Sequence, residues 1–307
     1  MVGVDIGSAK IATIVAKVAA SDAVDEPVNI LGVSEVVSAG IRKGQIVDIK
    51  KAVESIAASL EAAERMAGYS ISHVVASIGG AHIESQNSRG VVAVAATGGE
   101  INSSDLGRVI EAARAVSLPS TREIIHVLPR NYIVDGQEGI KDPIGMTGVR
   151  LEVDTHIISA NAVSLKNLEK ALSQIGADVD AVVFSGYASS LSVLTDTEKE
   201  LGVVVADIGA GTTDISLYVE GSVAYSSVLP IGARHITNDL AIGLRISIES
   251  AEKIKLFLSK SFKKHVKIEG QEVEKETKNS DEVDLDPLGL TEEIRKVSKK
   301  TLVDGII

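Results

Sequence analysis

One short motif occurs twice in the sequence, and this repeat constrains the fold more than any other feature. Residues 2–10 and residues 204–214 both have the pattern of an apolar strand that ends in Asp-Ile-Gly and continues into a turn of small residues. Glycines in such turns remove Cβ, so backbone N–H groups can approach the oxygens of a phosphate chain. A single strand with Asp-x-Gly is common, whereas two copies suit two half-domains that face one phosphate chain.

The repeat extends beyond the motif, because each copy is followed by two more strands and a helix. The elements predicted after the first copy span 10–18, 28–37 and 49–63, and those after the second copy span 214–219, 222–229 and 236–242. A hairpin turn is predicted at Glu220-Gly221. Two strand-strand-strand-helix units indicate an internal duplication and therefore two related domains.

Between the two copies lies a segment, from about residue 80 to 156, that has no counterpart downstream. It contains a helix that begins at Ser103 and runs to about Val116, and strand-like stretches at 90–95 and 124–128. Glycine and proline then punctuate residues 136–148. The sequence therefore predicts a small α+β subdomain inserted into the first domain.

The character of the sequence changes after Gly243. We predict a helix over 250–260, a charged stretch over 263–278, an acidic loop over 279–287 and a helical pattern from Thr291 onward. Because that amphipathic pattern stops at Ile307 without a cap, we expect the natural protein to continue beyond it.

Composition places the chain among soluble globular proteins. Its 307 residues suffice for two domains, and 45% of them are hydrophobic and 24% charged. No apolar run reaches the roughly 20 residues that cross a bilayer, and no leader precedes the first strand, which favours a cytosolic protein. The net charge of −11 argues against nucleic-acid binding, and the lack of cysteine excludes disulfides and thiolate metal sites.

The two turns suit a nucleoside triphosphate and Mg²⁺. Asp5 and Asp207 would hold the ion through water, because Mg²⁺ dehydrates reluctantly. Lys10 would add positive charge beside the phosphates. The other predicted phosphate contacts are Gly7, Ser8, Ala9, Gly209, Ala210, Gly211, Thr212 and Thr213.

Other kinds of site fit the sequence less well. A dinucleotide-binding fingerprint would need a third glycine and a helix after Gly211, where the chain has Asp214 and a predicted hairpin. Neither a Walker motif nor a Gly-x-Ser-x-Gly elbow occurs, and the six histidines show no metal-ligand spacing. The glycines could also serve only as tight-turn residues, and the lysines from 253 to 267 as a solvated helix face.

Paired phosphate turns in duplicated units resemble the superfamily of actin, heat-shock chaperone and sugar kinase ATPases. Within it, the chain resembles the FtsA family of bacterial cell-division proteins. The segments that carry this resemblance are 5–10, 40–44, 126–129, 137–143, 148–150 and 207–214. The resemblance implies an α/β fold of duplicated actin-like (ribonuclease H-like) domains with an inserted α+β subdomain, called 1C.

The resemblance also implies how the chain divides into subdomains. Subdomain 1A would comprise 1–79 and 158–198, subdomain 1C 80–157, the first part of 2A 199–245, and part of 2B 246–307. By motif position, Glu252 and Lys255 would contact the adenosine end of ATP, and Gly232 would lie beside its ribose or phosphates. The glycine-rich motif that closes over adenosine is expected after Ile307.

The function implied by the resemblance is that of a filament-forming tether. Members of the family bind ATP, polymerise on the inner face of the cytoplasmic membrane and attach FtsZ filaments to it at the division septum. Here we expect self-association through subdomain 1C and FtsZ contact through 2B. Membrane attachment is expected through a C-terminal amphipathic helix that would follow Ile307.

Turnover of ATP is expected to be slow or negligible. Chaperone ATPases have a glutamate that orders the attacking water, and this chain has Ser185 or Gly186 at that position. Asp5 and Asp207 would still position Mg-ATP. A small-molecule kinase of the same superfamily and a pilus-assembly actin-like adaptor remain alternatives, although segment 137–143 favours the FtsA family.

Overall fold

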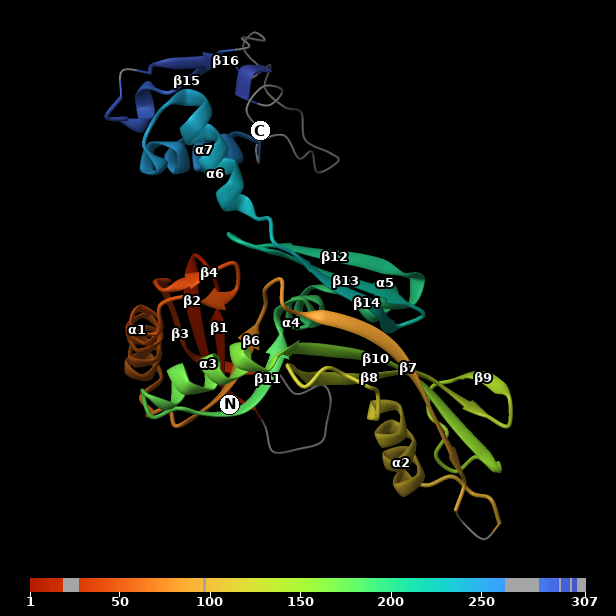
Figure 1. The fold of residues 1–307 in the computed structure, drawn as a ribbon. Coiled ribbons are helices and arrows are strands. Elements are labelled where there is room, and N and C mark those ends of the chain that lie inside the picture. Colours follow the sequence, from red (N-terminus) through yellow and green to blue (C-terminus); the bar gives the residue numbers. More distant parts are fainter. Residues whose placement is uncertain (19–27, 96–97, 263–281, 293, 299, 303–307) are drawn as a thin grey trace. The chain divides into compact units, whose positions relative to one another are not determined.

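The computed structural model describes residues 1–18, 28–95, 98–262, 282–292, 294–298 and 300–302 (Figure 1). The chain forms two compact units, Met1–Ile231 and Gly232–Ile307. Among the described residues, the first unit contains three sheets of three or more strands and a two-stranded hairpin.

A five-stranded sheet lies at the start of the first unit. Its strand order is β11-β6-β1-β2-β3, with β1 antiparallel to β2 and parallel to β6 (Figure 1). The strands are β1 (Val2–Ile6), β2 (Lys10–Lys17), β3 (Asn29–Val37), β6 (His73–Ile78) and β11 (Asp178–Phe184). The bounds of β1, β2 and β3 agree with the predicted strands because turn glycines and apolar alternation mark their ends.

Two helices pack with this sheet, α1 (Ile49–Ala67) and α3 (Ala162–Ser173). Asp48 caps α1 by accepting a hydrogen bond from Lys51 N, and Gly68 ends the helix in a left-handed conformation. Leucines and isoleucines of both helices share one core with the alternating residues of β1 and β6. Between β3 and α1, β4 (Ile41–Arg42) and β5 (Gln45–Ile46) form a short hairpin.

The segment between β6 and α3 forms a sheet of its own with strand order β7-β10-β8-β9. Its elements are β7 (Glu84–Ala93), α2 (Ser103–Arg114), β8 (Arg122–Val134), β9 (Gln137–Ile140) and β10 (Arg150–Asn161). This confirms the predicted α+β insert, although β10, an inner strand of its sheet, was not predicted. From Ile157 to Ala160 every residue of that strand is buried, so no alternation marks it.

A third sheet has the order β12-β13-β14 and follows α4 (Ser185–Val193) and α5 (Asp196–Leu201). Its strands are β12 (Val203–Ile208), β13 (Thr213–Val219) and β14 (Ser222–Leu229). The predicted turn between the last two is present, with positive φ at Glu220 and Gly221. The three antiparallel strands repeat β1-β2-β3, which confirms the duplication.

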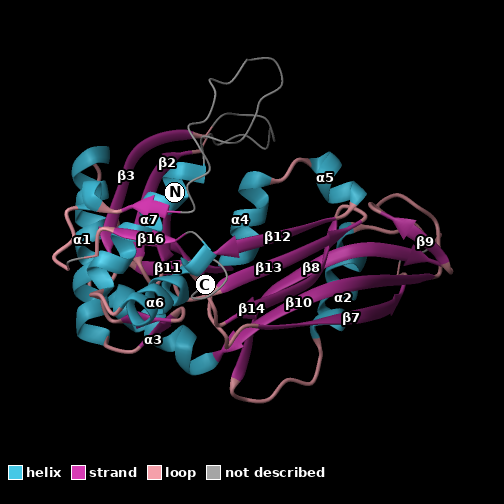
Figure 2. Cartoon of the chain, turned by 90° about the horizontal axis from the view of Figure 1, so that it is seen from above, coloured by secondary structure: helices cyan, strands magenta, loops and turns pink. Residues whose placement is uncertain are grey.

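The third sheet lies against the inserted sheet, with β14 beside β7, β8 and β10 (Figure 2). Polar side chains join the two sheets. The buried His156 of β10 is hydrogen-bonded through Nδ1 to Asn87 Oδ1 at 2.8 Å and through Nε2 to Ser226 Oγ at 3.0 Å. Ser85 Oγ donates to the carbonyl of Ser226 at 2.7 Å.

In the second unit, α6 (Ala233–Leu244) packs on α7 (Ile248–Phe262) over a small apolar core. The short strands β15 (Glu282–Asp284) and β16 (Lys296–Ser298) pair with each other, and a 3-10 turn spans Asp286–Leu288.

Two predictions for the end of the chain were wrong in part. Residues 282–284 are a strand instead of an acidic loop, and residues 296–298 are a strand instead of a helix. Val283 and Val297 lie opposite each other in this ladder and are both buried in the core with Leu285, which decides the conformation. The predictions for 263–278 and 303–307 lie outside the described residues.

Candidate functional site

The two Asp-Ile-Gly turns have the same geometry. In the first, Gly7 N donates to the carbonyl of Lys10 at 3.0 Å, and in the second Gly209 N donates to the carbonyl of Thr212 at 2.9 Å. A Cβ added at Gly7 would lie 2.8 Å from the Lys10 carbonyl oxygen, and one at Gly209 would lie 3.1 Å from that of Thr212. The backbone of each turn is therefore so closely packed that it leaves no room for a side chain at the glycine.

Both turns present backbone donors. Among the described residues, the N–H groups of Ala9, Ala210 and Gly211 have no protein hydrogen-bond partner. Backbone N–H groups without a protein partner, in glycine-containing turns, are the kind of donor that a phosphate chain needs. The predicted cofactor, a nucleoside triphosphate, therefore fits the residues present.

The β4–β5 hairpin brings the two turns together. Gly44 N, at its tip, donates to the hydroxyl of Ser8 in the first turn at 2.9 Å. On the other side, a Cβ added at Gly211 would lie 3.0 Å from Ser8 Oγ and 3.2 Å from the backbone of Lys43. Ser8 and Gly211 are both buried, so the turns and the hairpin tip form one packed unit.

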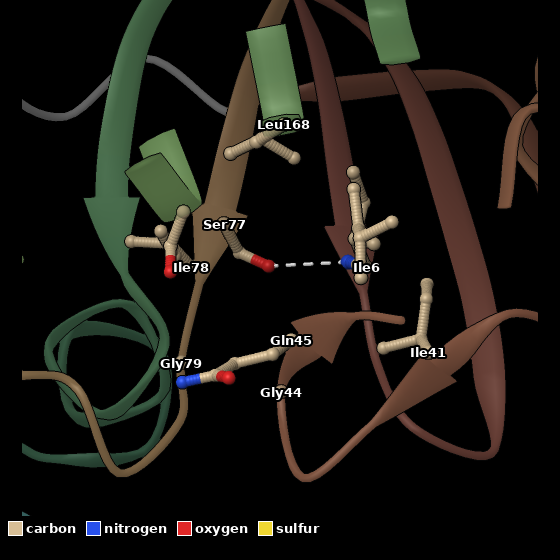
Figure 3. A pocket seen from close by; sticks show the side chains of 10 residues that line it. Ile6, Ile41, Gly44, Gln45, Ser77, Ile78, Gly79 and Leu168 are labelled. Atoms are coloured by element: carbon tan, nitrogen blue, oxygen red, sulfur yellow. Dashed lines mark hydrogen bonds between the residues drawn. The ribbon is translucent and has the colours of Figure 1, made fainter. Parts of the chain in front are cut away.

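A small cavity of about 20 Å³ lies behind the hairpin, lined by Ile6, Ile41, Gly44, Gln45, Ser77 and Gly79 among others (Figure 3). That volume holds roughly one water molecule. The hydroxyl of Ser77, one of its polar groups, accepts from Ile6 N at 3.3 Å (Figure 3). The same hydroxyl donates to Asp5 Oδ1 at 2.5 Å. The cavity is therefore too small to hold a nucleotide, and Ser77, which lines it, is hydrogen-bonded to Asp5 beside the first turn.

Serine hydroxyls hold both predicted metal-binding aspartates. Asp5 is exposed at the end of β1 and accepts from Ser77, whereas Asp207 is half-buried and accepts from Ser189 Oγ at 2.6 Å. In the part of the chain that the structure describes, no group of three or more His, Asp or Glu side chains could hold a metal ion directly. The assignment of Mg²⁺ to Asp5 and Asp207 stays a prediction.

A third carboxyl group, that of Asp214, lies in the same place. It is opposite Asp207 in the β12–β13 ladder, it is only 6% exposed, and its Oδ1 has no hydrogen-bond partner among the described residues. Burial, together with the charges of Asp207 and Asp5, raises the pKa of Asp214 to about 7. Asp214 was not among the predicted site residues, although the hairpin predicted after Gly211 would place it across from Asp207.

Two predicted phosphate contacts have other partners. The ammonium of Lys10 pairs with Glu35 at 2.9 Å, and the hydroxyl of Thr213 donates to the carbonyl of Ile231 at 2.8 Å. Ser185 and Gly186 stand at the position where chaperone ATPases have the water-ordering glutamate. They lie at the start of α4. A Cβ added at Gly186 would lie 3.1 Å from Asp214 Cβ, so this position does border the buried carboxyl group.

The remaining predicted residues belong to the second unit, where they lie together. Thr237 Oγ1 and Lys255 Nζ both donate to Glu252 Oε2 at 2.6 Å, and Gly232 directly precedes α6. Burial raises the pKa of Glu252, but the hydrogen bonds from Lys255 and Thr237 outweigh it and leave the pKa below its ordinary value.

Comparisons with known proteins identify the family. A family model described as the SHS2 domain inserted in FtsA matches residues 80–159, and the model of cell division protein FtsA matches residues 204–305. The cell division protein FtsA of Borreliella burgdorferi is 44% identical over 256 residues, which cover 83% of this chain and 61% of that protein. The chain belongs to the FtsA family. The FtsA of Pseudomonas aeruginosa is 40% identical over 256 residues, 83% of this chain and 60% of that one.

This FtsA-family chain thus spans about 60% of the length of the curated relatives it matches. Among solved structures, it is similar to the PilM-PilN type IV pilus biogenesis complex with a TM-score of 0.60 and 13% identity, over 85% of this chain and 70% of that one. An identity this low shows the fold alone. The predicted α/β, actin-like fold with its inserted subdomain is confirmed. Among the described helices, none has the length and apolar character to span a bilayer.

Proposed function

We propose that this chain binds ATP with Mg²⁺ at its two phosphate turns and acts in bacterial cell division as a filament-forming tether for FtsZ at the membrane. The observation that carries the nucleotide part is the joining of both turns by one hairpin, together with the N–H groups of Ala9, Ala210 and Gly211, which have no partner among the described residues. Family membership supports the cell-division part.

The residues would divide the work as follows. The two turns would bind phosphate oxygens through backbone N–H groups, and Asp5 and Asp207 would hold the hydrated ion, each kept in position by a serine hydroxyl. Bound Mg-ATP would supply the negative triphosphate and the cation that these groups recognise. Glu252, Lys255 and Gly232 remain the predicted contacts of the adenosine end.

The protonation state of Asp214 affects how well this site can bind a triphosphate. A third ionised carboxylate beside Asp5 and Asp207 would repel the phosphates, whereas a protonated one does not. With its pKa at about 7, Asp214 is largely protonated in slightly acidic solution. We also propose that ATP turnover is slow at most, since Ser185 and Gly186, at the position of the water-ordering glutamate of chaperone ATPases, offer no carboxylate to order an attacking water.

The partners and the location are proposals from the family. The chain would polymerise through the inserted subdomain at 80–157, contact FtsZ through residues 246–307, and work on the cytoplasmic face of the membrane at the septum. Membrane attachment would use a C-terminal helix beyond Ile307. Of the alternatives, the pilus adaptor is supported only by a fold likeness at 13% identity, and no observation favours a small-molecule kinase.

Calorimetry with Mg-ATP tests the nucleotide site. Replacement Asp207→Ala should abolish binding, while Asp178→Ala, which removes an exposed carboxylate from the first strand residue of β11, should leave the affinity unchanged. Equal affinities of wild type and Asp207→Ala would refute the assignment. Cosedimentation with FtsZ filaments tests the partner, and a lack of FtsZ binding by the full-length protein would refute it.

A further inference from the structure

The tip of the β4–β5 hairpin is a feature of the site that the predicted nucleotide contacts leave unused. Lys43 and Gly44 form a two-residue turn, with φ of 51° and 73°, between the paired residues Arg42 and Gln45. Positive φ at both central positions is typical of the tight hairpin turn that matches strand twist. The direction of the tip is therefore fixed by its backbone.

Packing holds this tip against three other backbone segments. Gly44 N donates to Ser8 Oγ at 2.9 Å, and a Cβ added at Gly44 would lie 2.7 Å from the carbonyl oxygen of Gly79. A Cβ added at Gly211 would lie 3.2 Å from both N and Cα of Lys43. The backbone of Lys43 consequently lies against the second turn, while Gly44 is bonded to the first.

The ammonium of Lys43 is available for a ligand. The residue is exposed, and no described residue forms an ion pair or hydrogen bond with its side chain. By contrast, the ammonium of Lys10, which the sequence analysis assigned to the phosphates, is bonded to Glu35 on the neighbouring strand. Of these two lysines beside the turns, Lys43 is the one whose charge is uncompensated.

We propose that Lys43 is a third phosphate-binding element of this site, which contributes an ammonium to the distal phosphates of the nucleotide. The proposal rests on the proposed function, since it needs a nucleotide at the two turns. An ammonium is a flexible point charge that binds phosphate strongly where backbone N–H groups already orient it. The hairpin thereby makes one binding site out of two turns that lie on separate sheets.

Affinities for ATP, ADP and AMP test the role of Lys43. Because a charge-assisted hydrogen bond is lost, Lys43→Ala should weaken ATP binding about tenfold or more and leave AMP binding unchanged. Replacement Lys43→Arg should restore most of the affinity for ATP. The matched control is Arg42→Ala, which removes an exposed cation of the same hairpin and should behave like the wild type.

A second readout does not depend on a variant. Acylation of lysines in the wild-type protein, quantified by mass spectrometry, should be slowed by ATP at Lys43 and not at the exposed Lys166 of α3. If the wild type binds ATP but Lys43→Ala binds it equally well and Lys43 is not protected, the role of Lys43 is refuted and the nucleotide site stands. If the wild type binds no nucleotide, the proposed function fails, and the role of Lys43 fails with it.

Discussion

Replacement Asp214→Asn should stabilise the protein at neutral pH and have little effect in acid. The Asp214 side chain is 6% exposed, its Oδ1 has no hydrogen-bond partner among the described residues, and Asp207 lies opposite in the ladder. Asparagine keeps the shape of aspartic acid and cannot ionise, so it avoids the burial of a charge beside Asp207 and Asp5.

The size of the effect follows from the raised pKa. Burial and the neighbouring carboxylates move the pKa of Asp214 from 3.8 to about 7. Between these values the unfolded chain loses the proton while the folded chain retains it, so stability falls as pH rises and the loss is complete above about pH 7. At 1.36 kcal/mol for each pKa unit, the full cost is about 4 kcal/mol as an upper bound.

Three histidines titrate in the same range with the opposite sign. Burial lowers the pKa of His82, His126 and His156 from 6.5 to about 4, so their contribution to stability rises with pH over this interval. The pH dependence of the wild type alone therefore mixes both effects. The difference between the wild type and Asp214→Asn isolates the contribution of Asp214.

Urea denaturation followed by circular dichroism at pH 4.5, 5.5, 6.5 and 7.5 measures that difference. We expect the variant to gain stability relative to the wild type steadily across the series, toward about 2–4 kcal/mol at the highest pH. Asp178→Asn, at an exposed position, should show no such trend. A difference between wild type and Asp214→Asn that stays constant from pH 4.5 to 7.5 would show that the carboxyl group is already ionised and compensated.

Two further predictions concern packing and the metal site. A Cβ added at Gly90 of β7 would lie 2.2 Å from the carbonyl oxygen of Val109 in α2, so Gly90→Ala should lower stability by about 1–3 kcal/mol in thermal or urea denaturation. Its control, Gly107→Ala on α2, meets no atom within 4 Å and should raise stability slightly. Removal of the hydroxyl that orients Asp207, in Ser189→Ala, should weaken Mg-ATP binding about fivefold to tenfold by calorimetry, and unchanged affinity would contradict this support role.

Sequence reasoning predicted the fold best where local signals suffice. The strands around each Asp-Ile-Gly turn and the helix α1 were predicted within a few residues, because glycines, caps and periodicity mark their ends. The predictions were wrong where pairing with a residue distant in the sequence determines the secondary structure. Val297 is three residues from Ile294, which suits a helix, but pairing with Val283 makes it a strand residue.

The same distinction applies to the site. Both turns were found from their residues, whereas Lys43 and Asp214 were missed as functional candidates. Lys43 has no signal of its own in the sequence, since an exposed lysine in a hairpin is ordinary, and the pairing of Asp214 with Asp207 could be inferred only by working out the register of the predicted hairpin. Their significance comes from hairpin register and from contacts with Ser8, Gly211 and Asp207, which only the folded chain defines.

The two Asp-Ile-Gly turns have the same backbone geometry, but the residues that lie opposite their aspartates differ. In the first ladder Asp5 lies opposite Ala12, and in the second Asp207 lies opposite Asp214. Of these two ladders, only the second pairs the turn aspartate with another carboxyl group. If both turns bind one nucleotide, a change of pH near 7 should alter the affinity for Mg-ATP, because Asp214 lies opposite Asp207 and is coupled to Asp5, and Asp214→Asn should remove that dependence.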